Sequence, residues 1–235
     1  MRSHEVVSRE KWLAARRAHL AREKEFTRLR DELARERRAL PWLRVEKDYG
    51  FDTERGKRTL AELFGARSQL LVYHFMFGPE QEEPCKSCSF WADGYDRSVV
   101  HLAHRDVALV TVSRSPLPRL RAVKARMGWS FEWVSSGGSD FNRDFGVHFS
   151  EAELARGARL YNFGTIAFGM ADAPGVSVFY RDPEGAVFHT YSCYARGLDA
   201  LNGAYQLLDL VPKGRDEDAL ARPMAWLRHR DRYPD

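Results

Sequence analysis

The chain has few cysteines and no long apolar run. Only three of its 235 residues are cysteines, Cys85, Cys88 and Cys193, and so sparse and odd a count excludes the disulfide framework of a small secreted domain. No apolar stretch approaches the roughly 20 residues that a membrane-spanning helix needs. The first 20 residues carry charges such as Arg9 and Arg16 and no hydrophobic block, which is unlike a secretory signal. We therefore expect a cytoplasmic protein with no membrane partner.

Positive charge is scarce outside one segment. Residues 1–40 hold 12 Lys/Arg against 7 Asp/Glu, a net charge of +5, whereas the remainder holds 25 against 26, a net charge of −1. Because the body is neutral, it does not have the charge of a nucleic-acid-binding domain, and we expect no nucleic-acid partner. Hydrophobic residues make up 44% of the chain, enough to build a core.

The N-terminal segment is predicted to form a helical arm, residues 1–40, with a single helix over 8–38. Ser8 is suited to the N-cap, and Pro41 cannot continue the helix. Apolar residues recur on one face at steps of three and four: Trp12, Ala15, Phe26, Leu29 and Leu33. So narrow an apolar face cannot stabilise a helix alone. We expect the arm to pack on the body or to pair with a second copy as a homodimer.

Residues 41–212 show a mixed α/β pattern. Apolar runs predict strands at 69–77, 106–112, 131–134, 176–180 and 186–191, the last two joined as a hairpin. Helices are predicted at 59–64, 89–104, 116–127 and 197–210. The remaining residues, 213–235, are rich in charge and are expected to form a loose C-terminal tail.

Several stretches along nearly the whole chain resemble one known family. They are EKWLAARRAHLAREKEFTRLRDELARERRALPW, LLVYHFMFGPEQEEPCKSCSFWADGYD, VSRSPLPRLRAVKARMGWSFEWVSS, SDFNRDFGV, GVSVFY and FHTYSCYARGLDALNGAYQLLDLVPKGRDE. The sequence is similar to a bacterial thioredoxin-like family of uncharacterised proteins, the domain-of-unknown-function 899 family, provisionally described as dithiol–disulfide oxidoreductases. The resemblance implies an α/β fold of the thioredoxin-like type, with a central mixed sheet flanked by helices.

Cys85 and Cys88 form a C-x-x-C motif between a predicted strand and a predicted helix. A helix N-terminus stabilises a thiolate and lowers its pKa from about 8.5, and the adjacent Lys86 acts in the same direction. The spacing lets the second thiol attack a mixed disulfide formed by the first. We therefore predict thiol–disulfide exchange, with Cys85 as the nucleophile and Cys88 as the resolving thiol. Glu82 and Glu83 oppose the thiolate, but we expect the helix to outweigh them.

Three other interpretations of the cysteine pair stay open. A zinc site would need two further ligands, and the candidates, Cys193 with His189 or His101 with His104, are distant in the sequence. A thiol peroxidase of the peroxiredoxin type has Thr or Ser three residues before its cysteine, where this chain has Glu82. The third interpretation is a binding protein that keeps the fold without catalysis. We expect no metal and no cofactor.

The thioredoxin fold also implies a substrate-binding role for Pro174. Thioredoxins place a cis-proline before the third core strand, facing the cysteines, and the neighbouring backbone pairs with an extended substrate. Pro174 stands at that point in the order of elements, although a trans turn proline is the alternative. Trp91 is a second candidate for the substrate surface, and the expected partner is a protein or small-molecule thiol or disulfide.

Other conspicuous residues are better explained by packing. Tyr95 and Trp129 are large aromatics that suit the core. His74, in a buried strand, is interpreted as a hydrogen-bonded core histidine, and Cys193 as a small buried hydrophobe. The loop 137–149, with three phenylalanines among polar residues, is interpreted as a packed surface loop.

Overall fold

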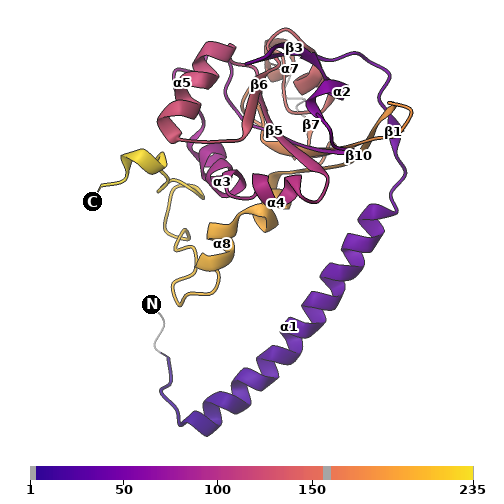
Figure 1. The fold of residues 1–235 in the computed structure, drawn as a ribbon. Helices are drawn as coiled ribbons and strands as arrows, with labels where there is room; N and C mark the ends of the chain where they lie inside the picture. The colour runs from indigo at the N-terminus through magenta and orange to yellow at the C-terminus, as the bar shows by residue number, and fades with distance from the viewer. Residues whose placement is uncertain (1–3, 156–159, 235) are drawn as a thin grey trace. The chain divides into compact units, whose positions relative to one another are not determined.

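A computed structural model describes residues 4–155 and 160–234 (Figure 1). The chain divides into two compact units, Met1–Pro41 and Trp42–Asp235. No helix in the described part of the chain is both long and apolar enough to cross a membrane.

The first unit is built around one helix, α1 (Arg9–Arg38), within one residue of its predicted start. The backbone N–H of Lys11 donates to Oγ of the N-cap Ser8 at 3.4 Å, and Arg35, Arg37 and Arg38 lie in the last turn, where cations suit the helix dipole. No described residue of α1 is buried. The apolar side chains of Trp12, Phe26, Leu29 and Leu33 are exposed.

The second unit contains an eight-stranded sheet in the order β1-β10-β9-β4-β5-β6-β2-β3. Its strands are β1 (Leu43–Arg44), β2 (Gly50–Thr53), β3 (Gly56–Thr59), β4 (Gln69–His74), β5 (Val107–Ser113), β6 (Glu132–Ser135), β9 (Gly175–Arg181) and β10 (Val187–Tyr194). A separate pair consists of β7 (Leu160–Tyr161) and β8 (Ile166–Ala167).

The centre of the large sheet has the thioredoxin arrangement. Strand β4 runs parallel to β5 and antiparallel to β9, and β10 pairs antiparallel with β9. A helix, α3 (Lys86–Asp96), connects β4 to β5, and α5 (Leu117–Met127) connects β5 to β6. The order β10-β9-β4-β5, with the cysteines at the start of α3, confirms the predicted thioredoxin-like fold.

Both faces of the sheet are covered, so the central strands are apolar on both sides. On one face, Tyr73 of β4 packs in a cluster with Trp91 of α3 and Leu120 of α5. On the other face, Leu70 and Val72 of β4 pack with residues of α2 (Leu60–Leu63) and α6 (Phe141–Asp144). Figure 1 shows α3 and α5 together on one side of the sheet. The cysteine motif therefore lies on the α3/α5 side.

Several predicted boundaries were wrong for local reasons. The helix predicted at 89–104 begins at Lys86 and breaks into α3 and α4 (Val99–Ala103). The helix predicted at 197–210 is a 3₁₀ helix, η1 (Ala195–Leu201), followed by α8 (Gly203–Leu208). The break falls at Asn202, whose side chain caps α8 by accepting from Tyr205 N. The remaining short helices are α7 (Glu151–Ala155) and η2 (Arg230–Arg232).

The C-terminal segment, residues 213–234, is not loose, which corrects the prediction. Leu227 is 2% exposed and His229 1% exposed. One carboxylate oxygen of Glu217 accepts hydrogen bonds from Tyr205 Oη at 3.0 Å, Met224 N at 2.9 Å and Trp226 Nε1 at 2.6 Å. The segment packs on the body because apolar residues among its charges find partners there.

Candidate active site

Cys85 is the N-cap residue of α3. Its backbone is extended, with φ −60° and ψ 123°, and its Sγ accepts the backbone N–H of Cys88 at 3.4 Å. Pro84 before it cannot donate a backbone hydrogen bond, while Cys85 N donates to Met76 O at 3.2 Å. The sulfur therefore occupies the place that a serine or aspartate oxygen takes at an ordinary helix start.

The two thiols have opposite electrostatic environments. A hydrogen bond from the Cys88 side chain, with backbone hydrogen bonds from Cys88 and Ser87, outweighs burial and lowers the pKa of Cys85 to about 7. Burial raises the pKa of Cys88 well above its usual value. Cys85 is partly exposed and Cys88 is 2% exposed. Cys85 is therefore the thiol that ionises more easily, and Cys88 is the more protected of the two.

Cys88 is held from two directions. Met76 N donates to its Sγ at 3.5 Å, and the Tyr73 hydroxyl donates to its backbone carbonyl at 3.1 Å. Cys193 of β10 is 8% exposed and belongs to the same apolar cluster. The interpretation of Cys193 as a buried apolar residue agrees with this position.

Arginines hold the acidic loop before Cys85. Glu83 accepts from Arg232 at 2.9 Å and from Arg126 at 3.4 Å, and the hydrogen bond from Arg232 is the main cause that lowers the pKa of Glu83. Arg119 donates to the carbonyls of Pro79, Gln81 and Glu82. Of the two carboxylates that were expected to oppose the thiolate, that of Glu83 is therefore paired with cations.

A pocket of about 1330 Å³ lies over the cysteines. Cys85, Cys88, Trp91 and Pro174 all line it, so the structure brings the four predicted site residues together. Trp91 is 6% exposed and donates from Nε1 to Leu198 O at 2.8 Å, which fixes its ring in the wall. Residues 213–218 and 220–225 and Leu227 form another part of the wall.

Pro174 is half-buried, and its peptide bond is trans. The prediction of a cis-proline at this position is therefore wrong, and the trans alternative is right. The carbonyl of Pro174 accepts a hydrogen bond from the Tyr161 hydroxyl, which in turn accepts from Ala195 N at 2.8 Å. Tyr161, 1% exposed, was not predicted to take part in the site. Its position depends on long-range packing that no local pattern around residue 161 signals.

The other conspicuous residues lie in the packed interior. His74 is 1% exposed, its Nε2 lies 2.8 Å from Ser177 Oγ, and burial lowers its pKa to about 3. Trp129 donates from Nε1 to Asp93 at 2.7 Å. Tyr95 packs edge-on against Tyr73 with ring centroids 4.9 Å apart. In the loop 137–149, Phe141 is fully buried.

Within the described ranges, no group of three or more His, Cys, Asp or Glu side chains is arranged to hold a metal ion. The expected absence of a metal stays a prediction, which elemental analysis of the purified protein tests.

Comparison with known proteins places the chain in a family. The family described as "Bacterial protein of unknown function (DUF899)" matches residues 1–233. The chain belongs to this family. No curated protein matches the DUF899 chain in sequence.

Among solved structures, the chain is similar at low identity to peroxiredoxins. Peroxidoxin BcpB from Mycobacterium tuberculosis is 12% identical with a TM-score of 0.44, covering 68% of this chain and 93% of that one. Peroxiredoxin Q from Xanthomonas campestris is 16% identical with a TM-score of 0.45, covering 66% and 86%. The mitochondrial 2-cys peroxiredoxin from Plasmodium falciparum is 10% identical with a TM-score of 0.41, covering 71% and 91%.

Proposed function

We propose that this DUF899 protein exchanges electrons between the Cys85–Cys88 dithiol and a disulfide substrate. The observation that carries the proposal is the asymmetry of the pair. Cys85 has a pKa of about 7 and opens into a pocket, while Cys88 lies buried behind it with a raised pKa. An attacking thiol works best when its pKa is near the ambient pH.

The exchange has two displacement steps. The Cys85 thiolate attacks one sulfur of the substrate disulfide, forming a mixed disulfide and releasing the other half as a thiolate. Cys88 then loses its proton to solvent or to that thiolate and attacks Cys85 Sγ, so the Cys85–Cys88 disulfide forms and the second substrate thiolate leaves. Two electrons pass from the dithiol to the substrate. In the cytoplasm that we expect for this protein, the reducing thiol pool favours the dithiol form.

Two alternatives remain as outcomes of the test. A thiol peroxidase would consume hydrogen peroxide through a sulfenic acid at Cys85, but the position three residues earlier holds Glu82 and no hydroxyl. A binding protein without catalysis would show no reversible Cys85–Cys88 disulfide at all.

The first experiment measures the pH dependence of alkylation at Cys85 in three reduced proteins. We expect a midpoint near pH 7 in the wild type. Cys88→Ala removes the hydrogen bond that contributes most to lowering the pKa of Cys85. The midpoint should therefore move up towards the free-thiol value of about 8.5. Cys88→Ser keeps a hydroxyl donor and gives an intermediate midpoint.

Mass spectrometry of the Cys85 peptide supplies the readout. A wild-type midpoint at or above the free-thiol value would favour the non-catalytic alternative. Equilibration with reduced and oxidised dithiothreitol completes the test, because the proposal requires a Cys85–Cys88 disulfide that forms and is reduced again. Peroxide consumption faster than disulfide exchange would favour the peroxidase.

A further inference from the structure

The backbone beside Pro174 is already paired within the chain. Residues 147–149 run antiparallel to residues 171–173, with an isolated β-bridge between His148 and Asp172. Phe149 N donates to Ala171 O at 2.8 Å, and Ala173 N donates to Val147 O at 2.9 Å. The segment 147–149 therefore covers the edge that leads into β9.

Two backbone groups that an extended polypeptide would use are already occupied. A peptide that adds to a sheet edge binds through backbone N–H and C=O groups of that edge. The N–H of Ala173 is taken by Val147, and the carbonyl of Pro174 is taken by the Tyr161 hydroxyl. The expectation that the backbone next to Pro174 pairs with an extended substrate does not fit this geometry.

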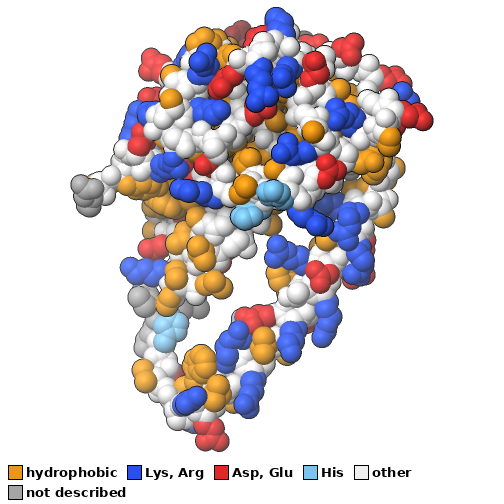
Figure 2. Space-filling view, in the orientation of Figure 1, with side chains coloured by type: hydrophobic (Ala, Val, Ile, Leu, Met, Phe, Trp, Pro, Cys, Tyr) orange, Lys and Arg blue, Asp and Glu red, His pale blue; other side chains and the backbone are white. Residues whose placement is uncertain are grey.

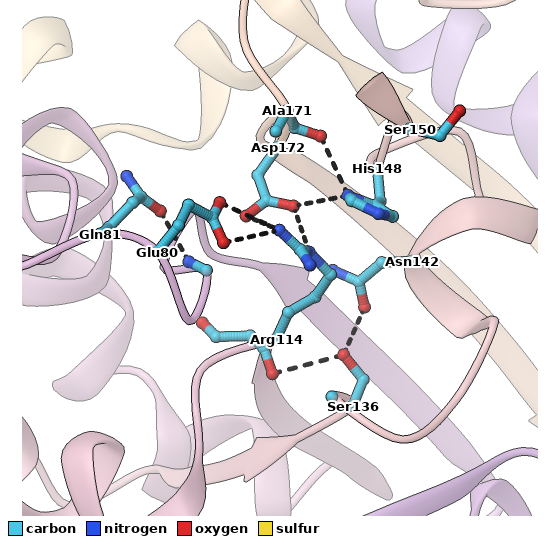
Figure 3. Close-up of polar contacts among 12 residues, drawn as sticks. Glu80, Gln81, Arg114, Ser136, Asn142, His148, Ser150, Ala171 and Asp172 are labelled. Atoms are coloured by element: carbon cyan, nitrogen blue, oxygen red, sulfur yellow. Dashed lines mark hydrogen bonds and ion pairs between the residues drawn. The ribbon is translucent and has the colours of Figure 1, made fainter. Parts of the chain in front are cut away.

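A network of ion pairs and hydrogen bonds surrounds the carboxylate of Asp172 in the covered edge (Figure 3). Arg114 binds Asp172 with two hydrogen bonds, from Nε at 2.7 Å and from an Nη at 3.2 Å, and the same Nη lies 3.1 Å from Glu80. His148 Nδ1 lies 3.1 Å from Ala171 O and 3.2 Å from an oxygen of Asp172. The side chains of Arg114 and Asp172 are 16% and 6% exposed. Opening the cover would break the contacts of His148 with Ala171 and Asp172, while Arg114 holds Asp172 in the edge beneath it.

The pKa of Asp172 agrees with a carboxylate that stays paired. Burial alone would raise the pKa of its carboxyl, but hydrogen bonds from His148 and Arg114 outweigh burial and lower that pKa. The carboxylate therefore stays charged at neutral pH. Because Glu80 belongs to the loop before Cys85, Arg114 joins the covered edge to the cysteine loop.

What remains open to a substrate is the side-chain pocket. Its wall includes apolar residues from two sides: Ile166, Phe168 and Met170 after β7, and Leu220, Pro223 and Met224 of the C-terminal segment. Its volume of about 1330 Å³ exceeds the 300–1,000 Å³ common for small-molecule pockets. Charges of both signs line it, among them Lys86, Lys213 and Asp216. The pocket has room for a whole small molecule next to Cys85.

We infer that the substrate of the Cys85–Cys88 pair is a low-molecular-weight disulfide held by pocket side chains, and not an extended polypeptide. The inference rests on the proposed function and adds the class of substrate. In the balanced reaction, one disulfide R–S–S–R and the protein dithiol give two thiols R–SH and the Cys85–Cys88 disulfide.

The test compares single-turnover oxidation of the reduced full-length protein by four probes. Cystine, glutathione disulfide and hydroxyethyl disulfide represent small substrates, and an unstructured 20-residue peptide with one internal disulfide represents an extended chain. Each rate is divided by the rate of the same probe with dithiothreitol, which has no pocket. We expect at least one small disulfide to exceed the peptide by about tenfold in this ratio, a difference of about 1.4 kcal/mol. An equal or higher ratio for the peptide overturns the inference.

Two variants sharpen the comparison. Met170→Trp fills the pocket at a residue that is 51% exposed, so the ratio for small disulfides falls, while the pH midpoint of Cys85 alkylation, which reports the ionisation of the thiol and not access to it, is unchanged. Leu207→Trp, at an exposed residue outside the pocket, is the matched control. Unchanged small-disulfide rates in Met170→Trp contradict recognition by the pocket.

Arg114→Gln loosens the covered edge. The rate of oxidation by the peptide, divided by its rate with dithiothreitol, should therefore rise relative to wild type. Arg143→Gln, which removes an exposed ion pair with Glu153, is its control. A peptide ratio that does not rise in folded Arg114→Gln contradicts the role of the cover. If Arg114→Gln does not fold, the comparison of Met170→Trp with Leu207→Trp still tests whether the pocket recognises small disulfides.

The proposed function and the proposed substrate class are contradicted by different results. If the wild-type protein forms no Cys85–Cys88 disulfide even with oxidised dithiothreitol, the proposed function is wrong. If it does so but prefers the peptide, only the substrate class is wrong.

Discussion

The two ends of the chain are both rich in charged residues but differ in how they are packed. Helix α1 exposes Trp12 by 56%, Phe26 by 64% and Leu29 by 51%. The C-terminal segment has no long helix, yet it buries Leu227 and His229 almost completely. In the space-filling view, hydrophobic side chains (orange) and charged side chains alternate along the helix (Figure 2).

The difference shows that regular structure and burial are separate properties. The backbone hydrogen bonds of α1 run between residues four apart, so its regular structure follows from the local sequence, although its apolar face still needs a partner for stability. Residues of the C-terminal segment depend on partners far away in the sequence, such as Tyr205 for Glu217 and Pro84 for His229, whose Nε2 lies 3.0 Å from the Pro84 carbonyl. One end was predictable locally and the other was not.

The largest expected effect comes from removing a buried side chain of the C-terminal segment. Leu227→Ala leaves a cavity and should lower the free energy of unfolding by about 2–5 kcal/mol. Leu207→Ala, at a residue that is 66% exposed, should change it by no more than about 0.5 kcal/mol. Urea unfolding followed by tryptophan fluorescence measures both. A Leu227→Ala protein as stable as the control would mean that the segment is not packed.

A smaller loss in the free energy of unfolding is expected when Glu217 is changed. Glu217→Gln replaces the charged acceptor of three hydrogen bonds with a neutral amide, and we expect a loss of about 1–3 kcal/mol. Asp218→Asn removes a charge from an exposed neighbour and serves as the control. The same unfolding measurement applies, and equal values for the two variants would contradict the bonding shown at Glu217.

At the other end of the chain, the expected effect is on assembly. We propose that the apolar face of α1 pairs with a second copy of the chain. Phe26→Ser with Leu29→Ser should then convert a dimer into a monomer while the unfolding of the body changes by less than about 0.5 kcal/mol. Light scattering coupled to gel filtration measures the mass. A wild-type monomer at micromolar concentration would rule out the pairing.

The smallest effect concerns the first turn of α1. Ser8→Ala removes the side-chain acceptor for Lys11 N, a cap contributing about 1 kcal/mol to the helix end. Hydrogen exchange at the Lys11 amide should become faster, and Ser8→Asp should restore the protection. Unchanged exchange in Ser8→Ala would show that the 3.4 Å contact does not protect that amide.

The amino-acid sequence by itself determined the local features of this protein. The cap at Ser8, the apolar runs of β4 and β5 and the Cys85–Cys88 spacing at a helix start all depend on residues within a few positions of one another. Such features follow from hydrogen bonds and side-chain periodicity along the chain. The thioredoxin-like order of elements followed from them and from the family resemblance.

Only the tertiary structure decided what surrounds the cysteines. Tyr161 reaches the Pro174 carbonyl, Arg114 joins Glu80 to Asp172 across 34 and 58 residues of sequence, and the C-terminal segment forms part of the pocket wall. These contacts depend on which distant groups the folded sheet brings within hydrogen-bonding distance, and no periodicity in the sequence records that. The cysteine pair at a helix start was therefore readable from the sequence, whereas the shape of the pocket around it was not.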